Sequence, residues 1–134
     1  MGRLNPVRVL VDTHAFLWWL AGDRRLSEAA QGVIANPDNS VLVSAASAWE
    51  VTTKHRLGKL PGAAVVAGDV MAAIDDHGFE PLSIPVSHAE RAGRLPGPRR
   101  DPFDRMLIAQ SLAHDLPLVS NESLFDRYGV RRIW

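Results

Sequence analysis

The sequence predicts an α/β fold in which a central, mostly parallel sheet of four or five strands is flanked by helices on both faces. Short runs rich in apolar and β-branched residues recur along the chain, and segments with helical patterning separate them. Strands that alternate with helices favour a parallel sheet, because each crossover lays a helix against one face. The 134 residues contain no internal repeat and no linker-like tract, so we expect a single domain over residues 1–134.

The first third of the chain supplies two predicted strands and two predicted helices. Residues 7–11 form the first predicted strand, and the apolar segment that follows, through Leu20, predicts a buried helix. Ser27 is suited to cap a second helix that runs through Ala35. The run at residues 40–44 predicts the second strand.

The middle of the chain predicts two further helices and a third strand. Helical patterning covers residues 45–57 and residues 63–77, and Gly58 and Gly78 are suited to end these helices. Residues 79–84 predict the strand that follows.

The last third predicts two helices and two strands. Ser87 and Glu90 have the spacing of a capping box, which predicts the start of a short helix. Asp101 and Pro102 predict the N-cap and the first residue of a helix that continues through His114. The last two predicted strands are residues 117–120 and 130–134.

Composition excludes several classes of protein. The absence of cysteine removes a disulfide framework, a thiolate metal site and a cysteine nucleophile. The 15 Lys and Arg balance the 15 Asp and Glu, which argues against bulk electrostatic coating of nucleic acid but leaves a local basic groove open. The longest apolar runs fall far short of the roughly 20 residues that span a bilayer, and residues 1–11 lack the apolar region of a signal peptide. We therefore expect a cytoplasmic protein without a membrane segment.

Acidic residues follow or precede the predicted strands in a way that suggests a common site. Asp12 directly follows the first strand, Glu50 lies in the helix after the second, and Glu122 lies two residues beyond the fourth. Asp101 and Asp104 lie at the start of the helix that precedes the fourth strand. Functional crevices of open parallel sheets lie beyond the carboxyl ends of the strands, so these acids are expected to converge there.

Crowded carboxylates need a cation to stay ionised, and oxygen ligands of this kind suit Mg²⁺ or Mn²⁺. Such a site hydrolyses phosphodiesters through a metal-activated water and needs no protein nucleophile. The sequence contains no HExxH, GxSxG, P-loop or GxGxxG motif that would indicate a zinc peptidase, a serine hydrolase, an NTPase or a dinucleotide enzyme.

Each acid also has a simpler structural explanation. Glu50 precedes Lys54 by four residues, as in an exposed helical ion pair, and Asp101 is suited to be only an N-cap. Asp104 fits the favourable dipole of a helix start, and Glu122 fits the start of another helix. Asp12 is harder to explain in this way, because a carboxylate directly after a buried strand needs a partner or an ion.

Three tryptophans lie in apolar helical segments. We expect Trp18, Trp19 and Trp49 to lie in the core or on a dimer surface rather than to serve as base-stacking platforms.

Four segments carry a resemblance to a known family: VLVDTH at residues 9–14, SAASAWE at 44–50, DPFDRMLIAQ at 101–110, and LVSNE at 118–122 with Phe125 following. In this order and spacing the chain resembles the PIN domain family, and more narrowly the VapC-type toxins of prokaryotic toxin-antitoxin pairs. The resemblance implies a PIN-like three-layer fold and a Mg²⁺- or Mn²⁺-dependent endoribonuclease. It also implies an RNA substrate, a homodimer and a small VapB-like antitoxin. The apolar stretches at residues 16–20 and 45–51 are candidate surfaces for these partners or parts of the core.

By position, the resemblance implies that Asp12, Glu50 and Asp104 are metal-binding acids. Asp101 lies one turn before Asp104, and three roles are open for it: a helix cap, a group that contacts the metal ion indirectly, or a direct metal ligand. Glu122 is the expected fourth catalytic acid. It stands where the family more often has aspartate, and its extra methylene favours water-mediated ligation or weaker metal affinity.

Three further residues are placed near the site by the resemblance. Thr13 and Ser120 match positions beside the acids, and Arg105 is expected to orient a carboxylate or to contact the substrate phosphate. Two other functions remain open. One is a PIN-like module that has lost catalysis and binds RNA or a partner. The other is a metal-dependent DNA nuclease or phosphatase that uses the same carboxylates.

Overall fold

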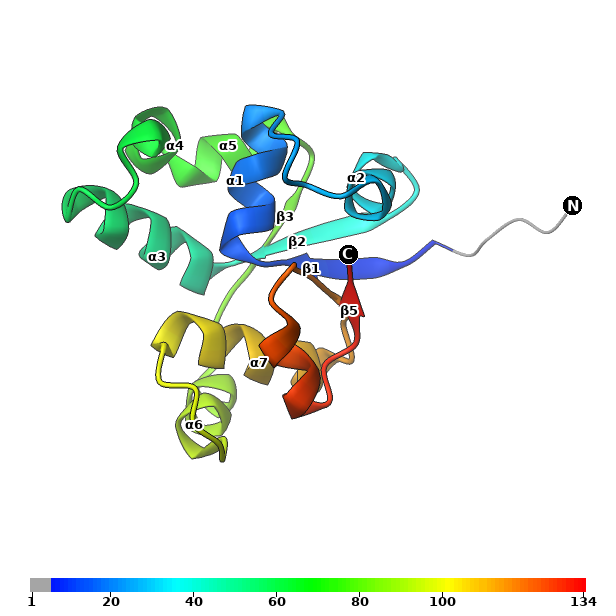
Figure 1. Cartoon of the computed structure of the whole chain (residues 1–134), viewed down its shortest axis with the longest axis vertical. Coiled ribbons are helices and arrows are strands. Elements are labelled where there is room, and N and C mark those ends of the chain that lie inside the picture. Colours follow the sequence, from blue (N-terminus) through cyan, green and yellow to red (C-terminus); the bar gives the residue numbers. More distant parts are fainter. Residues whose placement is uncertain (1–5) are drawn as a thin grey trace, which may run out of the picture.

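The computed structural model describes residues 6–134, in which five strands form one sheet with the order β3-β2-β1-β4-β5 (Figure 1). Every neighbouring pair of strands is parallel, as the sequence predicts. Part of the N-terminal stretch considered above for a signal peptide, residues 1–5, lies outside the described residues. The strands are β1 (Arg8–Val11), β2 (Ser40–Ser44), β3 (Glu80–Leu82), β4 (Leu118–Val119) and β5 (Arg132–Ile133).

Helices cover both faces of the sheet, which gives the predicted three layers (Figure 1). None of the helices formed by residues 6–134 has the length and apolarity needed to cross a membrane. The helices are α1 (Thr13–Ala21), α2 (Glu28–Ala35), α3 (Ala45–Arg56), α4 (Ala64–Gly68), α5 (Val70–Asp76), α6 (Val86–Arg94) and α7 (Pro102–His114), with 3₁₀ turns η1 (Pro61–Ala63) and η2 (Ser123–Tyr128).

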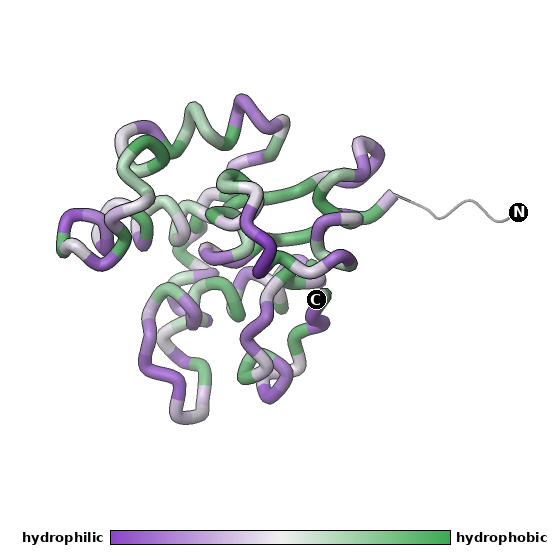
Figure 2. The backbone as a smooth tube through the Cα atoms, turned by 45° about the horizontal axis from the view of Figure 1, so that its top comes forward, coloured by the Kyte–Doolittle hydropathy of each residue, from purple (hydrophilic) through white to green (hydrophobic). Residues whose placement is uncertain are grey.

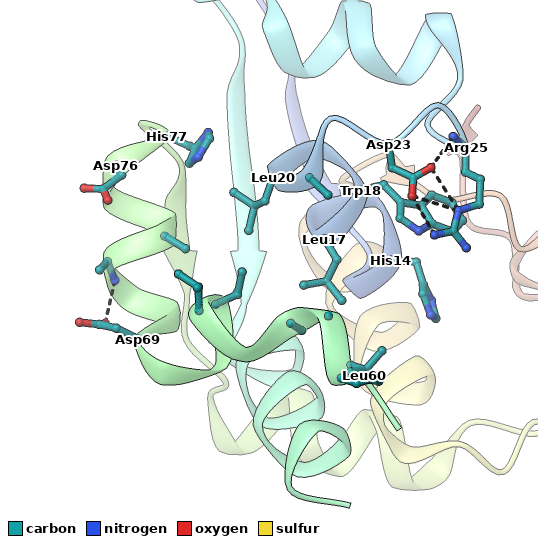
Figure 3. Close-up of a pocket in the computed structure, with 18 of the residues that line it drawn as sticks. His14, Leu17, Trp18, Leu20, Asp23, Arg25, Leu60, Asp69, Asp76 and His77 are labelled. Carbon is teal, nitrogen blue, oxygen red and sulfur yellow. Dashed lines mark hydrogen bonds and ion pairs between the residues drawn. The ribbon is translucent and has the colours of Figure 1, made fainter. Parts of the chain in front are cut away.

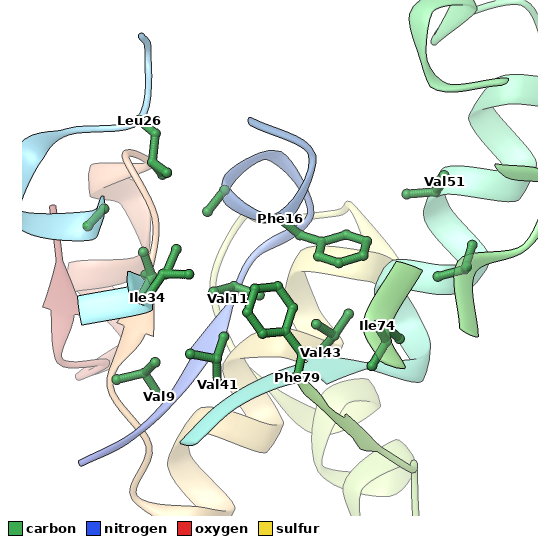
Figure 4. Packing of buried hydrophobic residues seen from close by; sticks show 14 residues of the cluster. Val9, Val11, Phe16, Leu26, Ile34, Val41, Val43, Val51, Ile74 and Phe79 are labelled. Atoms are coloured by element: carbon green, nitrogen blue, oxygen red, sulfur yellow. The ribbon is translucent and has the colours of Figure 1, made fainter. Parts of the chain in front are cut away.

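The central strands bury both of their faces because successive side chains point to opposite sides of a sheet. Val9 and Val11 pack with Phe16 of α1 and Phe79 in the cluster that α1, α2 and α5 cover (Figure 4). Leu10 points the other way and joins the cluster under α7 and η2. The strands therefore run as hydrophobic segments through the middle of the molecule, as the colouring of the backbone shows (Figure 2).

The prediction of one helix over residues 63–77 is wrong, because two separate helices, α4 and α5, occupy this segment and Ala63 belongs to the preceding turn η1. Asp69 interrupts the helix with a non-helical backbone (φ −159°, ψ 84°), and its side chain accepts a hydrogen bond from the Ala72 amide at 2.9 Å. Glycine at position 68 weakens the helix, and aspartate competes for backbone amides as an N-cap, so a new helix begins after this pair.

The predicted helix near residue 87 is confirmed, but its predicted capping box is wrong. Helix α6 begins at Val86 after Pro85, so Ser87 lies inside the helix and makes no cap. Proline fixes φ near the value that the turn requires, and the Pro85 carbonyl accepts the His88 amide at 3.0 Å. Glu90 lies within 3.3 Å of Arg94 instead of reaching back to the helix start.

A buried polar network ties β2, α6 and α7 together. Gln110 of α7 is fully buried, and its Oε1 accepts a hydrogen bond from the Ser44 hydroxyl at 2.5 Å. Its Nε2 donates to the Ser83 carbonyl at 3.0 Å and lies 3.2 Å from Nδ1 of His88. Because Ser44 is also the N-cap of α3, this network fixes the start of α3 against α7.

We expect Gln110→Leu to lower the free energy of unfolding by about 2–3 kcal/mol, because it leaves several buried polar groups without partners. Urea denaturation measures the change. The matched control is Gln31→Leu, since Gln31 is exposed on α2 and its side chain donates to the Leu26 carbonyl at 3.1 Å. If both variants lose the same stability, the network does not hold these elements together.

Candidate active site at the carboxyl edge of the sheet

All five acids that the sequence singles out line one cavity of about 320 Å³ beyond the carboxyl ends of the strands. Asp12 lies at the end of the central strand β1, and the helices and loops that follow or precede β2 and β4 bring the others to it. Two cations also line this acid cavity. The cavity is formed by Asp12, Glu50, Asp101, Asp104, Glu122, Lys54 and Arg99 together with Thr13, His14, Trp18, Asn121 and Phe125.

Asp12 is the most constrained of the acids. Its side chain is only 6% exposed and caps α1 by accepting a hydrogen bond from the Ala15 amide at 2.8 Å. Burial raises the pKa of Asp12, while hydrogen bonds from Ser120 and Ala15 act against that increase. Ser120 is fully buried and its side chain hydrogen-bonds to Asp12, so it lies beside this acid.

Glu50 is held from two sides although it lies in a helix. It is 4% exposed, and its Oε1 accepts a hydrogen bond from the Thr13 hydroxyl at 2.5 Å. Its Oε2 forms an ion pair with Lys54, one helical turn later. Burial acts to lower the pKa of Lys54, but the Glu50 carboxylate outweighs it and the pKa is raised. The predicted pair therefore exists, but it is largely buried rather than exposed.

Asp104 is held by an arginine from the loop before α7. Its Oδ2 accepts a hydrogen bond from Nε of Arg99 at 2.8 Å, and the same guanidinium lies 3.7 Å from Oε2 of Glu122. Burial and the charges of Asp101 and Glu50 raise the pKa of Asp104, and Arg99 opposes them. One cation thus compensates two of the acids.

Asp101 and Glu122 both serve as caps while they line the cavity. Oδ1 of Asp101 accepts from the amides of Phe103 and Asp104 at 2.9 and 3.1 Å, as expected for an N-cap of α7. Oε1 of Glu122 accepts from the Leu124 amide at 3.2 Å at the start of η2. The structural explanations suggested by the sequence apply to both residues, and each keeps a second carboxylate oxygen.

Arg105 lies outside the acid cavity and supports the loop that shapes it. Its guanidinium donates to the backbone carbonyls of Ala92, Leu95 and Arg99, at 3.0, 2.5 and 2.8 Å. It therefore fixes the segment from which Arg99 reaches Asp104, instead of reaching a carboxylate itself. The sequence does not predict the role of Arg99, because only the path of this loop brings it to the site.

The oxygen donors of the cavity have the chemistry that Mg²⁺ and Mn²⁺ prefer. Within residues 6–134, however, no three Asp, Glu or His side chains are grouped closely enough to hold an ion together. Lys54 and Arg99 instead provide the positive charge beside the acids. The residue types fit a hard cation, and the present side-chain positions are those of an ion-paired site.

A larger hollow of about 750 Å³ adjoins the acid cavity and shares His14 and Trp18 with it. Figure 3 shows this hollow between α1 and the segment that carries α4 and α5. Leu17 and Leu20 line it, and the ion pair between Asp23 and Arg25, 2.7 Å long, lies at its rim.

Comparison with known proteins agrees with this geometry. A sequence model of the PIN domain matches residues 9–131, so the chain belongs to the PIN domain family. Over 64 residues it is 42% identical to Ribonuclease VapC16 of Mycobacterium tuberculosis, a match that spans 48% of this chain and 44% of that protein. The chain therefore matches less than half the length of this curated relative. The predicted resemblance to the PIN family and to VapC proteins is confirmed.

Solved structures of low sequence identity share the fold. The crystal structure of VapBC2 from Rickettsia felis bound to a promoter DNA fragment superposes with a TM-score of 0.65 at 13% identity, covering 96% of this chain and 100% of that chain. VapC20 of Mycobacterium tuberculosis, described as a Sarcin-Ricin loop cleaving toxin, gives 0.61 at 18% identity and covers 91% and 95%. FitAcB of Neisseria gonorrhoeae gives 0.57 at 14% identity, with coverage of 92% and 95%.

The raised pKa of Asp12 predicts a pH-dependent gain in stability when its charge is removed. The protonated carboxyl favours the fold fully below the ordinary pKa of aspartate, and this contribution is lost as pH rises through the raised value. Asp12→Asn keeps a capping oxygen for Ala15 and removes the buried charge. We expect the Tm to rise at pH 7, where the buried charge is removed, and to rise less at pH 4.

Calorimetry in EDTA over this pH range measures the effect. Asp126→Asn is the control, because hydrogen bonding to Arg132 lowers the pKa of Asp126 and its neutralisation should bring no gain at pH 7. A gain for Asp12→Asn that does not change with pH would contradict this account of the buried charge.

Proposed function

We propose that the protein is a divalent-metal-dependent endoribonuclease and the toxin of a VapBC-type toxin-antitoxin pair. The observation that carries this proposal is the convergence of five carboxylates on one cavity at the carboxyl edge of a PIN fold. The names of Ribonuclease VapC16 and of VapC20, a Sarcin-Ricin loop cleaving toxin, support RNA as the substrate.

Asp12, Glu50 and Asp104 would hold Mg²⁺ or Mn²⁺, with Asp101 and Glu122 contributing their second oxygens. When bound, such an ion polarises the scissile phosphate and lowers the pKa of a water molecule that attacks it. The chain's own side chains prepare this site for the substrate. Thr13 fixes one oxygen of Glu50, and the Ser120 hydroxyl lies beside Asp12.

Lys54 and Arg99 are the groups of the cavity suited to bind the phosphates of RNA. Both are about 29% exposed at the side chain, and both already lie against carboxylates that a metal ion would neutralise. From these positions at the wall of the cavity both side chains can donate to phosphate oxygens, and the guanidinium of Arg99 binds phosphate with good geometry.

An antitoxin and a second copy of the chain are the proposed protein partners. Of the first predicted apolar stretch, Phe16 is fully buried, whereas Leu17, Trp18 and Leu20 line the hollow of Figure 3. We assign that hollow to apolar side chains of the antitoxin, since the similar Rickettsia felis structure is of a VapBC pair. The homodimer and the cytoplasmic location remain predictions.

Cleavage of a mixed RNA pool by the purified, antitoxin-free protein in Mg²⁺, Mn²⁺ or EDTA tests the function. We expect cleavage only with a metal ion. The cleavage rate should fall by more than about 100-fold in Asp12→Asn and Asp104→Asn, which is a larger loss than the removal of a residue that only supports the metal ligands would cause. Asp126→Asn is the matched control, because Asp126 is exposed, pairs with Arg132 at 2.9 Å and lies outside the cavity.

Two outcomes would redirect the proposal. Cleavage that survives EDTA, or that is unchanged in both cavity variants, contradicts a metal nuclease at this site. Binding of RNA without cleavage in any metal favours a PIN-like module that has lost catalysis. The observation that supports this alternative is that one carboxylate oxygen of Glu122 is used to cap η2. Single-stranded DNA and a phosphate monoester, tested beside the RNA, separate a ribonuclease from a DNA nuclease or a phosphatase.

A further inference from the structure

Trp49 is an exposed aromatic residue beside a buried catalytic acid. It precedes Glu50 in α3, yet 60% of Trp49 is exposed whereas Glu50 is 4% exposed. The core position considered for Trp49 from the sequence is therefore wrong, because this side of α3 faces solvent. An exposed indole is costly in water and is common where a protein binds a partner or a ligand.

A second aromatic residue holds Trp49 in place. The rings of Trp49 and Phe103 make an edge contact with centroids 4.8 Å apart and an interplanar angle of 76°. Phe103 precedes Asp104 in α7 just as Trp49 precedes Glu50 in α3. Nζ of Lys54 lies 6.0 Å from the Phe103 ring and also pairs with Glu50. The aromatic pair is thus linked to both acids and to one cation of the acid cavity.

Trp49 also borders an apolar hollow of about 230 Å³ next to the acid cavity. Helices α3 and α7 contribute to both: Glu50 and Asp104 face the acid cavity, whereas Trp49 and Met106 face the hollow. A ligand with a charged part in the acid cavity and a flat apolar part at Trp49 would match the two surfaces. A nucleotide has these two parts.

We propose that Trp49 and Phe103 form a stacking platform for an unpaired nucleobase next to the scissile phosphate. This inference rests on the proposed function. Bases of a duplex are stacked on one another and cannot reach such a platform, whereas unpaired bases stack readily on aromatic side chains. Lys54 and Arg99, at the adjoining cavity, supply the positive charge that the phosphates require.

Binding in EDTA tests the platform without depending on cleavage. The anisotropy of a fluorescein-labelled, unstructured oligoribonucleotide gives its Kd for the full chain, and a hairpin duplex of the same composition serves as the comparison. We expect Trp49→Ala to weaken single-strand binding by about 10-fold and Trp49→Phe to stay within about 3-fold of wild type, with duplex binding weak and unchanged in both.

The matched control is Leu57→Ala, because Leu57 is 52% exposed at the end of the same helix and lies in neither cavity. It should bind the single strand as wild type does. Unchanged Kd for Trp49→Ala, or equal loss for single strand and duplex, overturns the platform.

Two other outcomes separate this inference from the proposed function. Sedimentation shows whether Trp49→Ala dissociates a dimer. If it does, and the RNA affinity per chain is unchanged, Trp49 belongs to a surface between two copies of the chain and the platform is overturned. If Asp12→Asn abolishes metal-dependent cleavage but Trp49→Ala cleaves at the wild-type rate, the platform is overturned and the proposed function stands. If the wild-type chain neither binds nor cleaves RNA, both proposals fail together.

Discussion

The position of β1 at the centre of the sheet is the constraint on which the site depends. Val11 is paired with Val43 on one side and with Val119 on the other, so three strands end within one residue of the same level. Asp12 is the next residue of the central strand, and Ser120 is the next residue of its neighbour. Because the register is fixed by hydrophobic side chains on both faces, the polar residues that follow converge without any direct attraction between them.

The convergence creates an electrostatic problem that the protein solves locally. Burial disfavours the charge on Asp12 and Asp104, and the carboxylates also repel one another. Helix amides, Lys54 and Arg99 offset part of this cost, each from an element next to the acid that it serves. The protein can fold with this arrangement, but a bound cation would neutralise the carboxylates more fully than Lys54 and Arg99 do. Such a conflict between stability and function is common at functional sites.

Much of the fold and the site could be predicted because the deciding signals are local. The apolar strands, the N-cap at Asp101 and the acids after the strands follow from neighbouring residues, and the PIN resemblance orders them. The sequence does not predict the break at Asp69, because there a single dipeptide outweighs an otherwise helical pattern. The role of Arg99 depends on carbonyls held by Arg105, and the exposure of Trp49 depends on how α3 is rotated; neither has a signal in the sequence.

The short strands at the two edges of the sheet limit how the molecule can associate. Edge strand β3 has three residues and contains Pro81, which has no amide hydrogen to offer, and edge strand β5 has two residues and carries Arg132, paired with Asp126. Neither edge is a template on which another chain could continue the sheet, so growth into aggregates by strand addition is blocked. The sheet therefore favours association through the surfaces that its helices form rather than through its edges.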